Sequence, residues 1–183
     1  MGESTAEGEA DVEGEADVEA EVDAGVDAGV DAEDFGDILA ATREYLRTVV
    51  IPRESEIAEA DDVPADIRSG LAQMGLFGYA IPQRWGGLGL DLAQDVELAM
   101  EFGYTTLAVR SLFGTNNGIA GQVLVGFGTD EQKARWLGRI ASGEVIASFA
   151  LTEDGAGSDP AGLATRAVRE GDNWVIDGHK RFI

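Results

Sequence analysis

Apolar residues recur every three or four positions through the middle of the chain, which is the spacing of one face of an α-helix. The first such run extends from about residue 37 to Val50, and Pro52 is expected to stop it. A second helix is expected to start at Pro64, because proline suits a first helical turn, and to end at Gly75.

Three more helices are expected before residue 143. The third starts near Asp91, and its expected buried side consists of Leu92, Val96 and Ala99. The fourth spans roughly residues 106–127 and is expected to be interrupted around GTNNG. The fifth opens with a capping box, in which Thr129 is the cap and Gln132 lies three residues on.

The period changes after Gly143. VIASFALT (145–152) is predicted to be an apolar strand, LATRAVRE (163–170) alternates like a half-buried strand, and GDN turns the chain into NWVI. Asp177-Gly178 is a two-residue hairpin signal leading into HKRFI. The expected fold class is therefore α+β: an all-helical region, then the first strands of an antiparallel β domain. Because the chain stops at an apolar residue in an expected strand, we interpret it as part of something longer.

The negative charge is concentrated at the N-terminus. The net charge is −22, and residues 1–37 hold 15 acidic and no basic residues, which leaves 20 acidic against 13 basic residues in the remainder. The sequence EGEADV occurs twice in succession there, so residues 1–36 are expected to form a disordered tail. A calcium site is disfavoured, because the aspartates recur every four residues instead of at alternate positions. The body offers no basic patch for nucleic acid.

Composition excludes several kinds of site. The chain has no cysteine, so disulfides, Cys-ligated zinc and Cys nucleophiles are excluded, and its only histidine is His179. No apolar run is long enough to span a bilayer and no signal peptide opens the chain, so we expect no membrane partner and a cytoplasmic location.

The stretch FALTEDGAGSDPAG, residues 149–162, combines hydroxyls with a glycine loop. It does not match a Rossmann loop, because Pro160 occupies the third glycine position, and it lacks the lysine of a P-loop. Two interpretations remain. Backbone N–H groups and the hydroxyls of Thr152 and Ser158 could bind a phosphate and a polar ring edge, or the stretch could be a plain turn.

Four motifs in the same order resemble the acyl-CoA dehydrogenase family. FALTEDGAGSD is similar to the family's flavin-contacting T-E-P-G-A-G-S-D signature, with Asp154 where proline is usual. IPQRWGGLGL, FGTDEQKARWLGRIASGE and DGHKRFI resemble further segments of the family, and the likeness covers roughly residues 37–183. It implies a helical domain over residues 37–143 and a partial, truncated β-barrel domain over 144–183.

The resemblance also implies a cofactor and a set of site residues. The cofactor is FAD, and its expected contacts are Phe149, Leu151, Thr152, Gly157, Ser158, Phe182 and Ile183. Thr152 would meet the pyrimidine end of the flavin, and Gly157 and Ser158 the pyrophosphate. Ser158 would also border the substrate. Glu153 would order the loop, and no metal is expected.

The activity implied by the resemblance is α,β-dehydrogenation of an acyl-CoA thioester. The catalytic glutamate of the family belongs to a C-terminal domain, so no residue of this chain is assigned as catalytic and the chain alone is expected to be inactive. Electron-transfer flavoprotein is the implied electron acceptor, and a homodimer or homotetramer the implied assembly. Two alternatives stay open: a flavin oxidase or monooxygenase of the same superfamily, or a truncated non-catalytic protein.

Overall fold

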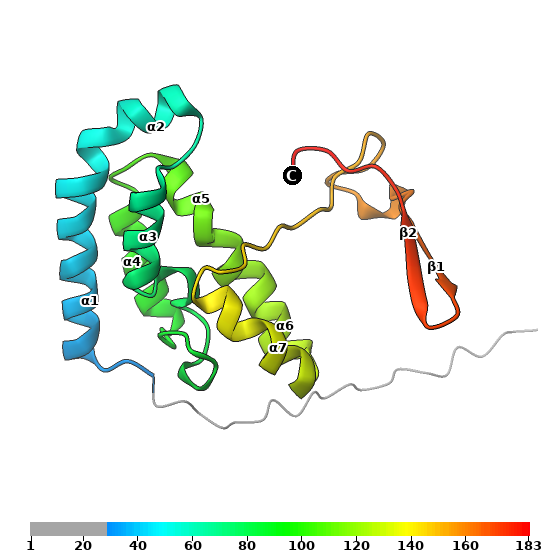
Figure 1. Ribbon diagram of the computed structural model, residues 1–183, viewed down its shortest axis with the longest axis horizontal. Coiled ribbons are helices and arrows are strands. Elements are labelled where there is room, and N and C mark those ends of the chain that lie inside the picture. Colours follow the sequence, from blue (N-terminus) through cyan, green and yellow to red (C-terminus); the bar gives the residue numbers. More distant parts are fainter. Residues whose placement is uncertain (1–28) are drawn as a thin grey trace, which may run out of the picture.

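The structure is a computed structural model that describes residues 29–183. The expectations about the acidic tail and calcium concern residues that lie mostly outside this range. A helical body is followed by a connector that runs to a small two-stranded hairpin, which confirms the expected fold class (Figure 1).

The first helix, α1 (Ala32–Tyr45), begins earlier than the expected residue 37. Asp31 caps it by accepting hydrogen bonds from the backbone N–H groups of Glu33 and Asp34. The expectation that Pro52 ends the helical run is wrong. A π-helical turn (Leu46–Val50) and a 3-10 turn (Ile51–Arg53) lead into α2 (Glu54–Ala60), because proline is tolerated in the first turn of a new helical segment.

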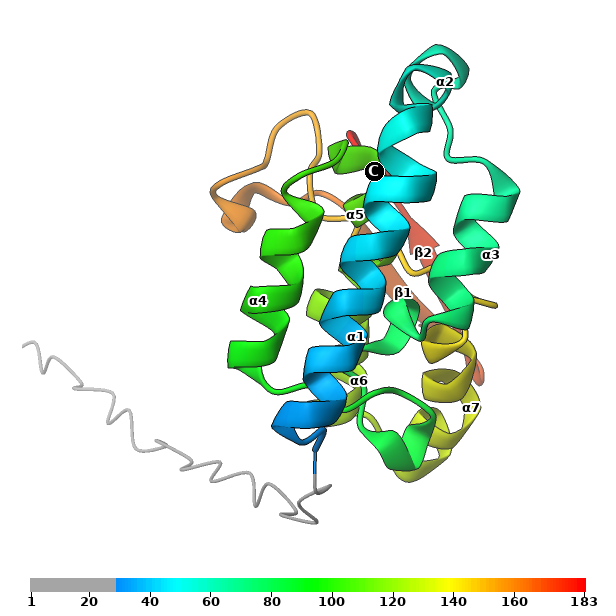
Figure 2. The same ribbon diagram turned by 90° about the vertical axis from the view of Figure 1, so that its left-hand side faces the viewer.

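Helix α3 (Ala65–Gln73) follows Pro64 as expected, and Gly75 ends it with a φ of +76°. Helix α4 (Leu92–Phe102) starts after Asp91, also as expected, but its buried face was assigned wrongly. Leu98, Glu101 and Phe102 are buried, whereas the side chains of Leu92 and Val96 are exposed. In Figure 2 α1 lies in front, with α4 on one side of it and α3 on the other, and the buried face of α4 packs toward α1 through an ion pair between Glu101 and Arg43.

The expected long fourth helix is present with its interruption. Helix α5 (Leu107–Thr115) continues through a π-helical turn (Asn116–Ala120) into α6 (Gly121–Phe127). Helix α7 (Asp130–Ala141) opens with the predicted capping box of Thr129 and Gln132. The core of the body centres on Phe113, whose ring meets those of Phe77, Tyr79 and Phe102 edge-on.

The hairpin pairs β1 (Arg166–Glu170) with β2 (Asn173–Asp177) in antiparallel register, from Arg166 opposite Asp177 to Glu170 opposite Asn173. Gly171, in the GDN turn, has a φ of +62°. Residues 145–152 and 178–183 form no strand, so these two expectations, including a hairpin at Asp177-Gly178, are wrong. A strand needs a partner to satisfy its backbone groups, and the described range supplies none for the apolar connector.

Candidate functional site

The carboxylate of Glu153 is the fixed point of the glycine loop. It accepts hydrogen bonds from the backbone N–H of Ala164 (2.7 Å), from the backbone N–H and hydroxyl of Thr165, and from the Nζ of Lys180 (2.8 Å). These bonds, with that of Lys180 first, lower the pKa of Glu153 to about 2, so it is ionised at neutral pH. A carboxylate held by this many donors orders the loop, as expected, and is poorly suited to abstract a proton.

The loop itself is a tight turn with open glycines. The backbone N–H of Glu153 donates to the carbonyl of Ala156 at 2.8 Å, and that of Ala156 to the carbonyl of Glu153 at 3.4 Å. A Cβ placed on Gly155 would meet nothing within 4 Å, and one on Gly157 only the Thr152 methyl at 3.9 Å. Neither glycine has a positive φ. Among the described residues, neither close packing nor a left-handed backbone requires glycine at these two positions. The space beside them is open, so a ligand could approach the backbone closely.

In a plain turn, the hydroxyls of Thr152 and Ser158 would be expected to bond to nearby backbone groups. Within the described range, neither the Thr152 hydroxyl nor the Ser158 hydroxyl makes a hydrogen bond, and the backbone N–H groups of Thr152, Gly157 and Ser158 are also unused. The local side-chain bond in this loop is instead made by Asp159, which accepts from the N–H of Ala161 at 3.0 Å. A group of unused donors beside open glycines suits an anionic or carbonyl-bearing cofactor.

The C-terminal segment lies against this loop. The backbone N–H of Arg181 donates to the carbonyl of Thr152 at 2.8 Å, and Lys180 Nζ to the carbonyl of Leu151 at 3.0 Å. Arg181 also pairs with Asp154 at 2.7 Å, at the position where the family usually has proline. Two motifs are thus joined by four contacts between residues that lie 27 or 29 positions apart in the sequence, counting the pair of Lys180 with Glu153.

The structure brings some of the predicted residues together and leaves others apart. Leu151, Thr152, Gly157 and Ser158 share the loop, and Phe182 is linked to it through Arg181. Phe182 is 88% exposed and has a φ of +59°, while Phe149 and Ile183 are also exposed and make no described hydrogen bond to the loop. A hollow of about 290 Å³ lies beneath the loop beside Glu153, Thr165 and Gly178, and none of the predicted cofactor contacts lines it.

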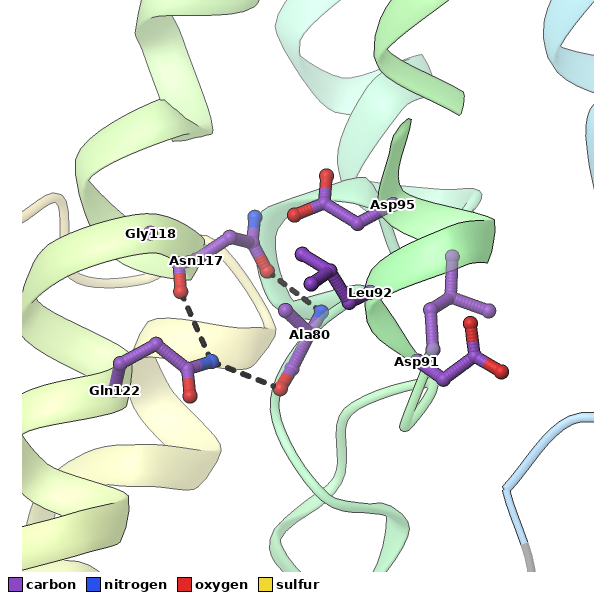
Figure 3. Close-up of a pocket in the computed structure, with 8 residues that line it drawn as sticks. Ala80, Asp91, Leu92, Asp95, Asn117, Gly118 and Gln122 are labelled. Carbon is purple, nitrogen blue, oxygen red and sulfur yellow. Dashed lines mark hydrogen bonds between the residues drawn. The ribbon is translucent and has the colours of Figure 1, made fainter. Parts of the chain in front are cut away.

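The helical body carries two further hollows around the π-helical turn. The first, of about 330 Å³, is bordered by α4 and by the polar side chains of Asn117 and Gln122, which bond to the backbone of Ala80 (Figure 3). The second, of about 370 Å³, is lined by Arg110, Ser111, Gly114, Thr115, Gly118 and Ile119. The guanidinium of Arg110 lies over Gly114, where a Cβ would be only 2.0 Å from its Nη1. No carboxylate in the described range pairs with Arg110.

Comparison with known proteins agrees with this fold and these motifs. The model of the acyl-CoA dehydrogenase N-terminal domain matches residues 32–144. The (2S)-methylsuccinyl-CoA dehydrogenase of Cereibacter sphaeroides is 44% identical over 121 residues, which are 66% of this chain and 22% of that protein. Subunit CarC of the caffeyl-CoA reductase-Etf complex of Acetobacterium woodii is 38% identical over 128 residues, 70% of this chain and 34% of its own length.

A solved structure of a related enzyme has a similar fold. Glutaryl-CoA dehydrogenase from Mycobacterium smegmatis, in complex with FADH2, superposes with a TM-score of 0.72 and 30% identity over 81% of this chain and 38% of that one. The chain therefore belongs to the acyl-CoA dehydrogenase family, a family of flavin-dependent oxidoreductases. It spans about a fifth to two fifths of the length of these relatives. No helix in the described range is long and apolar enough to cross a membrane.

Sequence reasoning missed several residues that shape this region. Thr165 and Lys180 hold Glu153, and neither stands out by periodicity or composition. Arg110 was also missed, although an arginine amid the apolar and small residues of α5 is a visible signal.

Proposed function

We propose that this protein is a flavin-dependent acyl-CoA dehydrogenase that introduces an α,β double bond into an acyl-CoA thioester. The observation that carries the proposal is the convergence of residues 151–158 with residues 180–182, which gathers unused donors and open glycines in one loop. Bound FAD would supply the acceptor for the hydride that leaves the β-carbon of the substrate.

The roles of the chain's own residues follow from their chemistry. The backbone N–H and hydroxyl of Thr152 are donors for the pyrimidine edge of the ring, where negative charge collects on reduction. Gly157 and Ser158 would offer N–H groups and a hydroxyl to the pyrophosphate, and Ser158 would also border the acyl-CoA. Leu151, Phe149, Phe182 and Ile183 would supply apolar contacts. Glu153 holds the loop and is not assigned as the base.

The remaining features of the proposal rest on the family. The helical domain is proposed to end at residue 143 and the β domain to begin at residue 144, with the first helix setting the start at Ala32. Electron-transfer flavoprotein is proposed as the electron acceptor, supported by the Etf complex to which one relative belongs. A homodimer or homotetramer is the proposed assembly. A flavin oxidase or monooxygenase of the same superfamily is the alternative.

Substitution of Gly157 by valine tests the cofactor site. A Cβ at this position would meet only the Thr152 methyl, at 3.9 Å, so the unfolding free energy of the cofactor-free protein should stay within about 0.5 kcal/mol of the parent. FAD titrated by fluorescence should nevertheless bind far more weakly, because the valine occupies the approach to the backbone. Ser158→Ala should weaken FAD binding about tenfold, the usual effect of one hydrogen bond to a charged group.

Controls separate a binding defect from a folding defect. Gly126→Ala, at an open helical glycine in α6, should leave FAD affinity unchanged. Thr152→Ala should shift the reduction potential of the flavin with less effect on affinity. If Gly157→Val and Ser158→Ala both bind FAD like the parent, the loop is only a turn and the assignment of this site is wrong.

A second observation favours one class of substrate. Two of the three relatives named above are dehydrogenases of methylsuccinyl-CoA and glutaryl-CoA, whose acyl chains end in a free carboxylate, whereas the third belongs to a caffeyl-CoA reductase. Arg110, half-buried in the hollow beside Gly114 and without a carboxylate partner in the described range, has the planar fork that binds a carboxylate through two parallel hydrogen bonds. We therefore propose short dicarboxylic acyl-CoA thioesters as substrates.

This substrate class predicts a selective defect in Arg110→Met. In protein expressed from the intact reading frame, kcat/KM for glutaryl-CoA or methylsuccinyl-CoA should fall about 10- to 100-fold, the range for a lost charge-assisted hydrogen bond. The value for butyryl-CoA should stay the same or rise. Arg47→Met, on the π-helical turn that follows α1, is a matched control and should change neither value. Equal losses for both substrate types would contradict a role for Arg110 in substrate choice.

A further inference from the structure

The π-helical turn between α5 and α6 contains a fully buried amide that reaches out of the helical body. Asn116 has no exposed surface, and its side chain makes three hydrogen bonds. Its Nδ2 donates to the carbonyl of Ile140 at 3.1 Å and to that of Val145 at 2.9 Å. Its Oδ1 accepts from the backbone N–H of Ala147 at 2.8 Å. Both N–H bonds and the oxygen are therefore used.

These bonds fix the connector that leaves α7. The carbonyl of one residue and the N–H of the residue two positions on are the two groups that an extended chain presents to a neighbouring strand. Asn116 bonds to this pair on Val145 and Ala147, so its amide takes the place of a neighbouring peptide group. The N–H of Val145 also donates to the carbonyl of Arg139 at 3.0 Å, which holds the same residue to α7.

Ala147 is where the connector parts from the helical body. Among the described residues, no hydrogen bond joins the body to any position beyond Ala147, and the next backbone hydrogen bonds are those of the glycine loop itself. Phe149 lies two residues further on, and Thr152 five. Figure 1 shows the connector running from the body toward the hairpin with no helix or strand beside it. Because each residue extends a chain by at most about 3.5 Å, the position of Ala147 limits how far from the body Phe149 and Thr152 can lie.

We propose that Asn116 is the positioning residue that sets where the FAD-contacting segment begins relative to the helical body. It acts through Val145 and Ala147 and touches neither cofactor nor substrate. One part of this inference, that Phe149 and Thr152 are thereby placed at the flavin, rests on the proposed function. Its structural part, the fixing of the connector, stands on the three hydrogen bonds alone.

The neighbouring residue provides a matched control. Asn117 is also fully buried in the same π-helical turn and also makes three hydrogen bonds through its side chain. Its partners are the carbonyls of Leu76 and Phe113 and the N–H of Ala80, all within the helical body. The two asparagines are thus alike in burial and bonding and differ in whether they reach the connector.

Hydrogen exchange measured by mass spectrometry tests the inference without any cofactor. Asn116→Ala and Asn117→Ala should both lower the unfolding free energy, because each leaves buried polar groups unpaired. Only Asn116→Ala should raise exchange in peptides covering residues 145–152, by at least tenfold at Ala147. Unchanged exchange there, or an equal rise in Asn117→Ala, would overturn the proposal.

A variant at Ala147, the partner of Asn116 in the connector, tests the same contact without changing Asn116 itself. Ala147→Pro removes the N–H whose hydrogen bond the Oδ1 of Asn116 accepts, and it changes no side chain of the helical body. With FAD bound, Ala147→Pro and Asn116→Ala should both shift the absorption maximum and reduction potential of the flavin, and Asn117→Ala should not. A potential unchanged in Ala147→Pro also overturns the inference, whereas a parent protein that binds no FAD contradicts the proposed function instead.

Discussion

Glu153 shows how one carboxylate inside a cofactor motif serves the fold. Its side chain is nearly buried, and Ala164, Thr165 and Lys180 all bond to it from beyond the loop. The sequence predicts that Glu153 orders the loop, but it does not indicate with which partners. The hydroxyl and the ammonium that hold it come 12 and 27 residues later, a separation at which no local pattern operates.

The low pKa of Glu153 predicts a pH dependence. The folded state lowers its pKa from 4.5 to about 2, so the ionised form is favoured by folding. Its contribution to stability is therefore fully present above about pH 4.5 and is lost as the pH falls toward 2. Hydrogen exchange of the Ala164 and Thr165 amides, corrected for intrinsic rates, should accelerate across this window.

Neutral variants check the cause of this dependence. Glu153→Gln should speed exchange at Ala164 and Thr165 already at pH 7 and should abolish the acceleration between pH 4.5 and 2. Asp154→Asn is the matched control, because the side chain of Asp154 is 70% exposed and its one ion pair with a described residue is with Arg181. If Asp154→Asn has the larger effect, Glu153 is not the group that holds the loop.

At the scale of elements, α4 shows a limit of the periodic pattern. Two sets of apolar residues follow helical spacing along it, Leu92, Val96 and Met100 on one side and Leu98 and Phe102 on the other. Both faces satisfy the pattern, so the sequence does not choose between them. The choice comes from packing, since α1 and α5 contact α4 and its Glu101 is paired with Arg43 of α1.

Two leucines of α4 allow this correction to be tested. Leu98 has no exposed surface and Leu92 is 80% exposed. Leu98→Ala should lower the unfolding free energy by about 2–5 kcal/mol, as a core cavity does. Leu92→Ala should change it by less than about 0.5 kcal/mol. Urea denaturation followed by circular dichroism measures both, and a larger loss in Leu92→Ala would restore the face expected from sequence.

At the scale of the whole molecule, charge and core are separated along the chain. Fifteen of the 35 acidic residues lie before residue 38, whereas among the described residues the buried apolar ones begin at Phe35 and the main core is built from α1 to α5. The described contacts of residues 29–31 are the cap of α1 and bonds from Gln83 and Gln94 to the carbonyls of Gly29 and Val30. These contacts tie residues 29–31 to the helical body.

Deletion of residues 2–28 should leave the body folded. The deletion removes 11 acidic and no basic residues, which halves the net charge from −22 to −11. Self-repulsion falls, so the thermal midpoint should stay the same or rise slightly, with a larger difference at low salt. Circular dichroism melts at two salt concentrations measure this. A longer deletion that also removes Gly29, Val30 and Asp31 should lower the midpoint, and equal behaviour of the two deletions would contradict the role given to residues 29–31.

The sequence by itself determined the features that are local. The helix starts at Asp91 and Thr129, the helix end at Gly75 and the GDN turn depend on interactions within a few residues. They were therefore predicted correctly. The motifs of the family are also local strings, which is why the class of protein was evident from them.

Tertiary structure alone decided what depends on distant partners. The buried face of α4, the absence of strands at residues 145–152 and 178–183, and the partners of Glu153 all depend on which segments meet in space. The same is true of Asn116. In the sequence it belongs to a stretch expected to interrupt a helix, whereas in the structure its amide bonds to Val145 and Ala147, which lie 29 and 31 residues further on. Burial and hydrogen-bond satisfaction are balanced over the whole fold, so a periodic pattern cannot specify them.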